Sequence, residues 1–274
     1  SFIHILLNNA FFLKIFFPST KIIIGPLQLH SKLDSGSNLS IMFTGKATYS
    51  PIIFPLQLTF KFLLLLTQPF SKLTYSLADK VVCNFNLIKR FYKSSIPAKK
   101  IAVIPTGVDL PQISEKVHRD KITIIAVGRL MEHKGQKYLL EAFNELSQKH
   151  PQVRLSLVGG GNRMDDYRRY VKDNGLNNKV TFSGNIPYGQ TGAKYQDSDI
   201  FCLPSLVDTN PVVVQEAMSF GLPVVASDVG AVPEVVANAG IIVKKGRSKL
   251  LRDALEKLVI NPKLRREMGE NGRL

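Results

Sequence analysis

Ile122-Thr-Ile-Ile-Ala-Val127 is an apolar, β-branched run of strand length, and Gly128 and Arg129 follow it directly. Such a run is typical of a strand that is buried on both faces. Gly128 allows a sharp turn, because glycine has no Cβ. A helix is expected next, since the following apolar residues recur at the spacing of one helix face. These residues are Tyr138, Leu139, Leu140, Ala142, Phe143 and Leu146.

The same unit of strand and helix recurs down the chain. Helical or short polar segments separate the apolar runs, and one further helix is expected near residues 163–174. Strands that alternate with helices indicate a parallel sheet with helices on both faces. We therefore expect a doubly wound α/β domain, in which ligands bind beyond the carboxyl ends of the strands. The further expected strands are Val153–Val158, Lys179–Phe182, Asp199–Leu203, Pro223–Ala226 and Gly240–Val243.

The chain changes character near residue 110. Residues 1–109 hold short apolar runs, including Ile22–Gly25 and Lys80–Cys83. Residues 110–120 combine proline, mixed charge and a lack of periodicity, as a linker does, and residues 121–274 form the regular domain. The chain begins at Ser1 inside an apolar run that lacks the pattern of a signal peptide, so it reads as the middle of a protein.

One upstream segment, residues 52–70, is very apolar. Pro55, Lys61 and Pro69 interrupt it, whereas a membrane-spanning helix needs ~20 uninterrupted apolar residues. We expect a buried or interfacial helix here, with a single membrane anchor as the alternative.

The composition is that of a folded, strongly basic protein. Apolar residues make up 45% of the chain, and the formal net charge is +15. A basic surface attracts phosphates or anionic lipid, so a nucleotide-sugar site, an anionic membrane surface and a generally basic proteome all remain as explanations. Nucleic acid is not an expected partner, because the basic residues are dispersed and no binding motif appears. Cys83 and Cys202 are expected to be buried free thiols, which suggests a reducing compartment.

Several enzyme classes lack their motifs. The five histidines show no metal-ligand spacing, and neither a G-x-S-x-G elbow nor a P-loop occurs. The run Gly159-Gly-Gly161 misses the G-x-G-x-x-G spacing, because Arg163 and Met164 occupy the later positions. We interpret this run as a tight turn between strand and helix rather than as a cofactor loop.

The loop after the first strand is a candidate diphosphate site. Gly128 and Arg129 open it, and His133-Lys134-Gly135 lead into the next helix. A guanidinium fork and an ammonium group on one loop suit the two negative centres of a diphosphate. The alternative is a solvated basic loop without a ligand.

A second candidate site is Asp208-Thr-Asn-Pro-Val-Val-Val-Gln-Glu216. Asn210 and Pro211 are expected as N-cap and first residue of a helix that runs to Phe220 and ends at Gly221. The first backbone N–H groups, including those of Val212 and Val213, would lack intrahelical partners and offer an anion site.

The two carboxylates of this segment suit hydroxyl groups. Glu216 shares a helix face with Val212 and Val213, so it could accept hydrogen bonds from vicinal hydroxyls such as those of a ribose. Asp208 precedes the helix and could hold the hydroxyls of a second ring. Alternatively, both carboxylates only favour the positive end of the helix.

Together these segments resemble the family 4 retaining glycosyltransferases of the GT-B fold, from about Ala78 to the C-terminus. The resemblance rests on several stretches in family order. They are Ala78-Asp-Lys-Val-Val, Ile101-Ala-Val-Ile-Pro-Thr-Gly-Val-Asp109, Gly128-Arg-Leu-Met-Glu-His-Lys-Gly135, Glu216-Ala-Met-Ser-Phe-Gly-Leu-Pro-Val-Val-Ala-Ser227 and Gly230-Ala-Val-Pro-Glu234. The implied architecture is two Rossmann-like domains, of which the N-terminal, acceptor-side one is incomplete in this chain.

The resemblance also implies residue roles. Arg129 and Lys134, on the loop that Gly128 opens, would bind the donor diphosphate. Glu216 would bind the nucleotide ribose and Asp208 the transferred sugar, although the family pattern Glu-x7-Glu has Asp208 in its first position. Main chain at Asn210, Pro211, Val212 and Val213 would line the sugar and phosphate pocket, and Asn185 and Ile186 would lie at the base.

The implied reaction needs neither a protein nucleophile nor a divalent metal nor a cofactor. Positive groups would stabilise charge on the departing diphosphate, and the acceptor hydroxyl would attack from the same face, so that the anomeric configuration is retained. The implied partners are a nucleotide-diphosphate sugar and a glycan or lipid-linked acceptor, to which the basic charge adds an anionic membrane surface. The implied location is the cytoplasm or the cytoplasmic face of a membrane.

The chain departs from the family pattern at both ends. The Gly-rich loop that opens the acceptor domain and the helix that crosses back to it are both missing, so the chain reads as a fragment. His30 stands loosely where the family has an acceptor-domain histidine, and a buried structural histidine is the alternative. Two other functions remain open at this point: a nucleotide-sugar 2-epimerase and a non-catalytic donor-binding fragment.

Overall fold

The computed structural model describes residues 31–33, 39–41, 79–94, 96–112, 120–208 and 210–273. The chain divides into two compact units, of which one comprises Ser1–Val82 with Tyr92–Ala102 and the other Cys83–Phe91 with Val103–Leu274. The predicted strand at residues 22–25, the apolar segment 52–70 and His30 lie outside the described residues. The domain boundaries at 109 and 120 stay a prediction.

The described residues upstream of 112 include two strand pairs. Strands β1 (Ser31–Leu33) and β2 (Leu39–Ile41) pair in antiparallel fashion. Strands β3 (Val81–Cys83) and β4 (Ile101–Val103) form a second two-stranded sheet, and helix α3 (Asn86–Tyr92) and the 3₁₀ helix η1 (Ala98–Lys100) lie between them in sequence. The strand predicted at Lys80–Cys83 is therefore confirmed.

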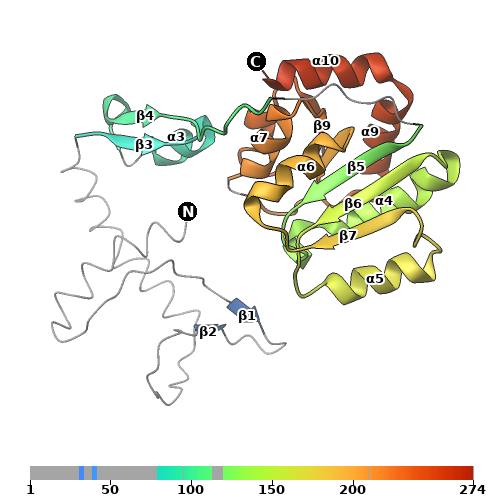
Figure 1. Cartoon of the computed structure of the whole chain (residues 1–274). Helices are drawn as coiled ribbons and strands as arrows, with labels where there is room; N and C mark the ends of the chain where they lie inside the picture. Colours follow the sequence, from blue (N-terminus) through green and yellow to red (C-terminus); the bar gives the residue numbers. More distant parts are fainter. Residues whose placement is uncertain are drawn as a thin grey trace. The chain divides into compact units, whose positions relative to one another are not determined.

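The larger unit is built on a six-stranded sheet (Figure 1). Its strands are β5 (Ile122–Val127), β6 (Val153–Val158), β7 (Val180–Gly184), β8 (Ile200–Leu203), β9 (Val224–Ser227) and β10 (Gly240–Val243). They lie in the order β10-β9-β8-β5-β6-β7, and every described pairing is parallel. The chain thus winds outward from β5 in one direction and then from β8 in the other. This doubly wound order places the topological switch point between β5 and β8.

Helices alternate with these strands along the chain. They are α4 (Gln136–Lys149), α5 (Met164–Asp173), α6 (Thr191–Gln196), α7 (Val212–Ser219), α8 (Val232–Val236), α9 (Ser248–Ile260) and α10 (Pro262–Arg273). The 3₁₀ helices η2 (Glu132–Lys134) and η3 (Tyr188–Gln190) precede α4 and α6. The predicted doubly wound α/β domain is confirmed, and the sequence places each of its six strands within two residues of the observed bounds.

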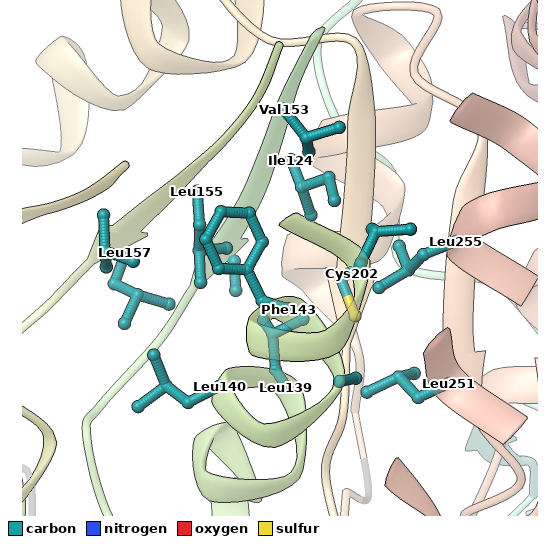
Figure 2. Packing of buried hydrophobic residues seen from close by; sticks show 14 of the residues in the cluster. Ile124, Leu139, Leu140, Phe143, Val153, Leu155, Leu157, Cys202, Leu251 and Leu255 are labelled. Carbon is teal, nitrogen blue, oxygen red and sulfur yellow. The ribbon is translucent and has the colours of Figure 1, made fainter. Parts of the chain in front are cut away.

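Two apolar clusters cover the two faces of the sheet, because successive strand residues point to opposite sides. Ile124 lies in the cluster that contains Phe143 of α4 and Leu255 of α9 (Figure 2). The next residue, Ile125, lies in the other cluster with residues of α6, α7 and α8. Cys83 and Cys202 are buried free thiols, as predicted. Cys202 belongs to the first cluster, where burial raises the pKa of its thiol strongly.

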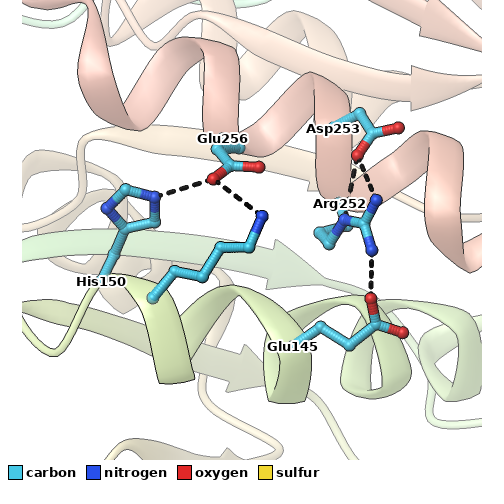
Figure 3. A network of polar contacts seen from close by, with 6 residues as sticks. Glu145, His150, Arg252, Asp253 and Glu256 are labelled. Atoms are coloured by element: carbon cyan, nitrogen blue, oxygen red, sulfur yellow. Dashed lines mark hydrogen bonds and ion pairs between the residues drawn. The ribbon is translucent and has the colours of Figure 1, made fainter.

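A polar network joins α4 to α9 outside the first cluster (Figure 3). His150 Nε2 lies 3.0 Å from Glu256 Oε1, and Lys149 Nζ lies 3.5 Å from the same oxygen. Arg252 of α9 contacts Glu145 of α4. Hydrogen bonding to His150, followed by burial in the opposite sense and the charge of Lys149, leaves the pKa of Glu256 below its ordinary value. These ion pairs fix two helices that lie on the face opposite α7.

Candidate functional site

Two loops meet at the switch point of the sheet. One follows β5 and contains residues 128–135, and the other follows β8 and contains residues 204–211. The N–H groups of Leu206 and Val207 donate to the carbonyl oxygen of His133, at 2.8 and 3.4 Å. The two segments that carry the predicted diphosphate and sugar residues are therefore bonded to each other through their backbones.

The close approach of these loops requires a glycine at residue 135. Gly135 has a φ of 69° and ends η2. A Cβ there would lie 2.0 Å from the carbonyl oxygen of Pro204, far inside contact distance. The buried Gln136 then donates from Nε2 to the carbonyl oxygen of Arg129 at 3.0 Å. The first turn of α4 thus fixes the backbone from which the Arg129 side chain extends.

The charged side chains of the two loops also meet. Lys134 Nζ lies 2.8 Å from Asp208 Oδ2, and the two side chains are 24% and 6% exposed. Ser205 Oγ is a second, longer donor to the same oxygen at 3.4 Å. Arg129 is exposed. Lys134 was predicted to bind the diphosphate and Asp208 the transferred sugar. In the structure the two side chains also form an ion pair with each other.

The pKa of His133 reflects the positive charge of this loop. Its pKa is lowered by burial first and then by the charges of Lys134 and Arg129, whereas Asp208 opposes the shift. Burial and the two cations thus favour the neutral imidazole, and the same positive charges would attract a polyanion. His133 was expected only as part of the loop, without a role of its own.

Helix α7 begins one residue later than predicted. Pro211, not Asn210, is the N-cap, no side chain caps the helix, and Asn210 is exposed. The Val212 N–H donates to the Asn210 carbonyl oxygen at 2.9 Å. Asn210 lies before the helix, so this bond is not an intrahelical one, but it occupies the N–H that was predicted to face an anion. Gly221, with a φ of 69°, ends the helix as predicted.

Glu216 is held by a residue that the sequence analysis did not identify. The hydroxyl of Tyr195, on α6, donates to Glu216 Oε2 at 2.9 Å. Tyr195 is buried, whereas Glu216 is half-buried. The only signal in the sequence is a large ring in a short helix of small and polar residues, and it does not reveal the partner 21 positions away.

The predicted base loop lies beside the glycine run. Asn185 Oδ1 accepts from the Gly160 N–H at 2.7 Å, and Ile186 is half-buried against the second apolar cluster. A Cβ at Gly159 would lie 2.1 Å from the carbonyl oxygen of Gly128. The glycine run is thus a tight turn between β6 and α5, as predicted, and its close packing brings the β5, β6 and β7 loops together.

The predicted donor residues lie outside two hollows of the described surface. A hollow of about 400 Å³ involves α7, α8 and residues 103–110, and another of about 430 Å³ lies between α4 and α5. Neither is lined by Arg129, Lys134, Asp208 or Glu216. Cations and backbone N–H groups of the two loops, rather than a hollow, therefore mark the candidate diphosphate site.

Two further features concern only the residues that the structure describes. Within these ranges, no three His, Cys, Asp or Glu side chains are grouped so that they could hold a metal ion. No helix in them is both long and apolar enough to cross a membrane.

Comparison with known proteins now assigns the family. Residues 111–274 match the model of the family described as glycosyl transferases group 1. The chain belongs to this family. The predicted resemblance is therefore confirmed at the level of the group, and the GT-B type of α/β fold is confirmed for the described residues.

Among its relatives is an uncharacterized glycosyltransferase of Haemophilus influenzae, 29% identical over 206 residues, which cover 74% of this chain and 58% of the relative. Another is the GDP-mannose-dependent alpha-(1-6)-phosphatidylinositol monomannoside mannosyltransferase of Mycolicibacterium smegmatis, 28% identical over 67% of this chain and 53% of the relative. The structure of Anabaena HepE in complex with UDP is similar in fold, with a TM-score of 0.65 and 24% identity over 76% of this chain and 62% of HepE. The chain thus spans little more than half the length of these curated relatives.

Proposed function

We propose that this chain supplies the donor-binding side of a retaining glycosyltransferase, which moves a hexose-type sugar from a nucleotide diphosphate to a glycan or glycolipid acceptor. The observation that carries the proposal is the meeting of Lys134 and Asp208, 2.8 Å apart, at the switch point of the sheet. Arg129 extends from the loop after β5, which also carries Lys134. Glu216 lies on α7, the helix that follows the loop of Asp208. Cations beside carboxylates suit a ligand that combines a diphosphate with two hydroxyl-bearing rings.

In this proposal each group has one task. Arg129 and Lys134 bind the diphosphate and stabilise the charge that grows on it as the sugar departs. Main chain at Asn210, Pro211, Val212 and Val213 lines the sugar and phosphate pocket. Asp208 orients the transferred sugar and Glu216 the ribose, while Asn185 and Ile186 lie at the base.

The proposed bond changes are balanced without a protein nucleophile, a cofactor or a divalent metal. The bond between the anomeric carbon and the phosphate oxygen breaks as a bond from the acceptor oxygen to the same carbon forms on the same face. The proton of the acceptor hydroxyl passes to the departing phosphate oxygen. The anomeric configuration is thereby retained, and catalysis consists of positioning and charge stabilisation.

The names of the relatives support a donor of this class without fixing its base. One similar protein is described as dependent on GDP-mannose, and a similar fold is solved with UDP. The acceptor of the mannosyltransferase is a phosphatidylinositol mannoside, which fits the proposed glycolipid acceptor. The net charge of +15 supports a peripheral position on an anionic membrane at its cytoplasmic face.

A binding panel tests the proposal. We expect a thermal shift with one class among UDP-, GDP- and ADP-sugars, followed by calorimetry with the free nucleoside diphosphate. An unchanged melting temperature with all three classes would argue against a donor site. Incubation with the donor alone separates transfer from epimerisation, because an epimerase changes the sugar without an acceptor. NMR of the anomeric proton in the product tests retention.

A further inference from the structure

We propose that Tyr195 is a positioning residue, which holds the Glu216 carboxylate in the orientation that binds the two ribose hydroxyls of the donor. The proposal rests on the proposed function and extends it to a residue outside the predicted site. It starts from one contact, the hydrogen bond from the Tyr195 hydroxyl to Glu216 Oε2 at 2.9 Å.

The direction of this hydrogen bond follows from its surroundings. The hydroxyl lies 2.9 Å from the carboxylate oxygen and 3.5 Å from the carbonyl oxygen of Val213. A phenol has one proton to donate, and a charged acceptor at the shorter distance takes it. Glu216 Oε2 is therefore engaged by the protein, while Oε1 remains for a ligand.

The Tyr195 ring is closely packed. Tyr195 is 1% exposed. Its ring centroid lies 6.1 Å from that of Phe201 on β8 and 5.5 Å from that of Phe220 after α7, both in tilted contacts. Aromatic packing of this kind fixes a side chain through its shape. The hydroxyl is thus held by the sheet and by the end of the helix that carries Glu216.

The fixed Tyr195 hydroxyl restricts the conformations of the Glu216 side chain. A glutamate side chain has three rotatable bonds, and a partly exposed one must lose this freedom when it binds a ligand. Tyr195 imposes much of that order before the ligand arrives. Because the hydroxyl is neutral, it adds no positive charge that would draw the carboxylate away from the ribose hydroxyls. Preorganisation of this kind increases affinity for the bound conformation.

The test is the variant Tyr195→Phe, which removes one oxygen and keeps the ring. Three ligands are compared by calorimetry: the nucleoside diphosphate that the wild type binds best among UDP, GDP and ADP, its 2′,3′-dideoxy analogue, and inorganic pyrophosphate. We expect the affinity for the nucleoside diphosphate to fall by roughly 3- to 10-fold, as for the loss of one hydrogen bond. The affinities for the dideoxy analogue and pyrophosphate should change by less than about twofold, because neither presents ribose hydroxyls to Glu216.

Controls separate positioning from packing. Tyr170→Phe removes a hydroxyl that hydrogen-bonds Asn144 on the other side of the sheet, and it should change none of the three affinities. In a Glu216→Gln background, Tyr195→Phe should have a much smaller effect, since the two residues act through one contact. If Tyr195→Phe is less stable than the wild type, the comparison of the three ligands still decides, because a folding defect weakens all three binding equilibria alike.

Two outcomes overturn the proposal. An unchanged affinity for the nucleoside diphosphate means that the hydroxyl does not matter, and an equal loss for all three ligands means that Tyr195 only supports the fold. A wild-type chain that binds no nucleoside diphosphate instead refutes the proposed function, and this inference with it. A loss of affinity that is confined to the ligand with ribose hydroxyls supports both the proposed function and the positioning role of Tyr195.

Discussion

The ion pair between Lys134 and Asp208 leads to a prediction of unusual sign: Asp208→Asn should tighten the binding of a free diphosphate. In the structure the ammonium group binds the carboxylate at 2.8 Å. A diphosphate that uses Lys134 must therefore compete with Asp208 or share the cation with it. Asparagine keeps the shape of the side chain and can still accept from Ser205, but it carries no charge.

The magnitude follows from the geometry of the pair. Two unit charges 2.8 Å apart attract by about 6 kcal/mol at an effective dielectric constant near 20. Most of this is offset by the desolvation of both groups, and measured charged hydrogen bonds contribute ~1.5–3 kcal/mol. Because Lys134 is 24% exposed, we take the low end of that range. Inorganic pyrophosphate should then bind roughly 10-fold more tightly to the variant, since 1.4 kcal/mol corresponds to a factor of ten.

The assay is calorimetry at fixed ionic strength, because salt screens these charges. Pyrophosphate and the free nucleoside diphosphate should both bind more tightly to Asp208→Asn, whereas the complete nucleotide sugar should gain less or lose affinity, since it also loses the carboxylate that orients its sugar. In a Lys134→Met background the effect of Asp208→Asn should shrink to the general loss of one negative charge. Weaker pyrophosphate binding to Asp208→Asn would refute the reasoning, because it would mean that Asp208 orients Lys134 for the ligand.

Three further predictions concern other groups. Arg129→Ala should weaken binding of the nucleoside diphosphate by more than ~10-fold in calorimetry, as for a lost charged hydrogen bond, and unchanged binding would remove the diphosphate role. Glu216→Gln should weaken binding of a nucleoside more than that of pyrophosphate, and an equal loss would make Glu216 structural. The Glu234 carboxylate accepts from the N–H groups of Asn86 and Leu87 at 2.7 and 3.1 Å; burial acts against ionisation, but these bonds prevail and lower the pKa of Glu234 below its ordinary 4.5. A carboxylate whose pKa is lower in the folded state stabilises the fold at pH values above its unfolded pKa, and this contribution is lost as the pH falls. Glu234→Gln should therefore lower Tm by roughly 2–4 °C near neutral pH and by less as the pH falls below about 4.5, measured in thermal melts.

The sequence was a good guide to the sheet for a physical reason. Each strand is a short apolar run between turn or helical segments, and this pattern is local. Strands such as Ile122–Val127 and Gly240–Val243 could therefore be assigned without knowing their neighbours. The positions of the candidate loops followed as well, because in a parallel sheet every carboxyl end lies on one edge.

Contacts between side chains could not be predicted in the same way. Lys134 and Asp208 are 74 positions apart, and Asn86 and Glu234 are 148 apart. Each pairing depends on how two elements pack and on the rotamers that this packing allows. The start of α7 was also missed by one residue, because Asn210 had a good capping residue type but its side chain does not cap the helix.

The two carboxylates of the site are held in different ways, and this difference suggests an order of recognition. Glu216 is bound by a neutral, buried hydroxyl that does not compete for anions, so the ribose end of the site is ready before the ligand arrives. Asp208 is bound by Lys134, the cation that the diphosphate would use in the proposed site. The diphosphate must take Lys134 from Asp208, and only then is the carboxylate free to orient the sugar. On this account the nucleoside binds first to the prepared ribose end of the site. The contact between Asp208 and the sugar forms only when the diphosphate has bound Lys134. Because Lys134 is shared, diphosphate binding and sugar binding are thermodynamically coupled.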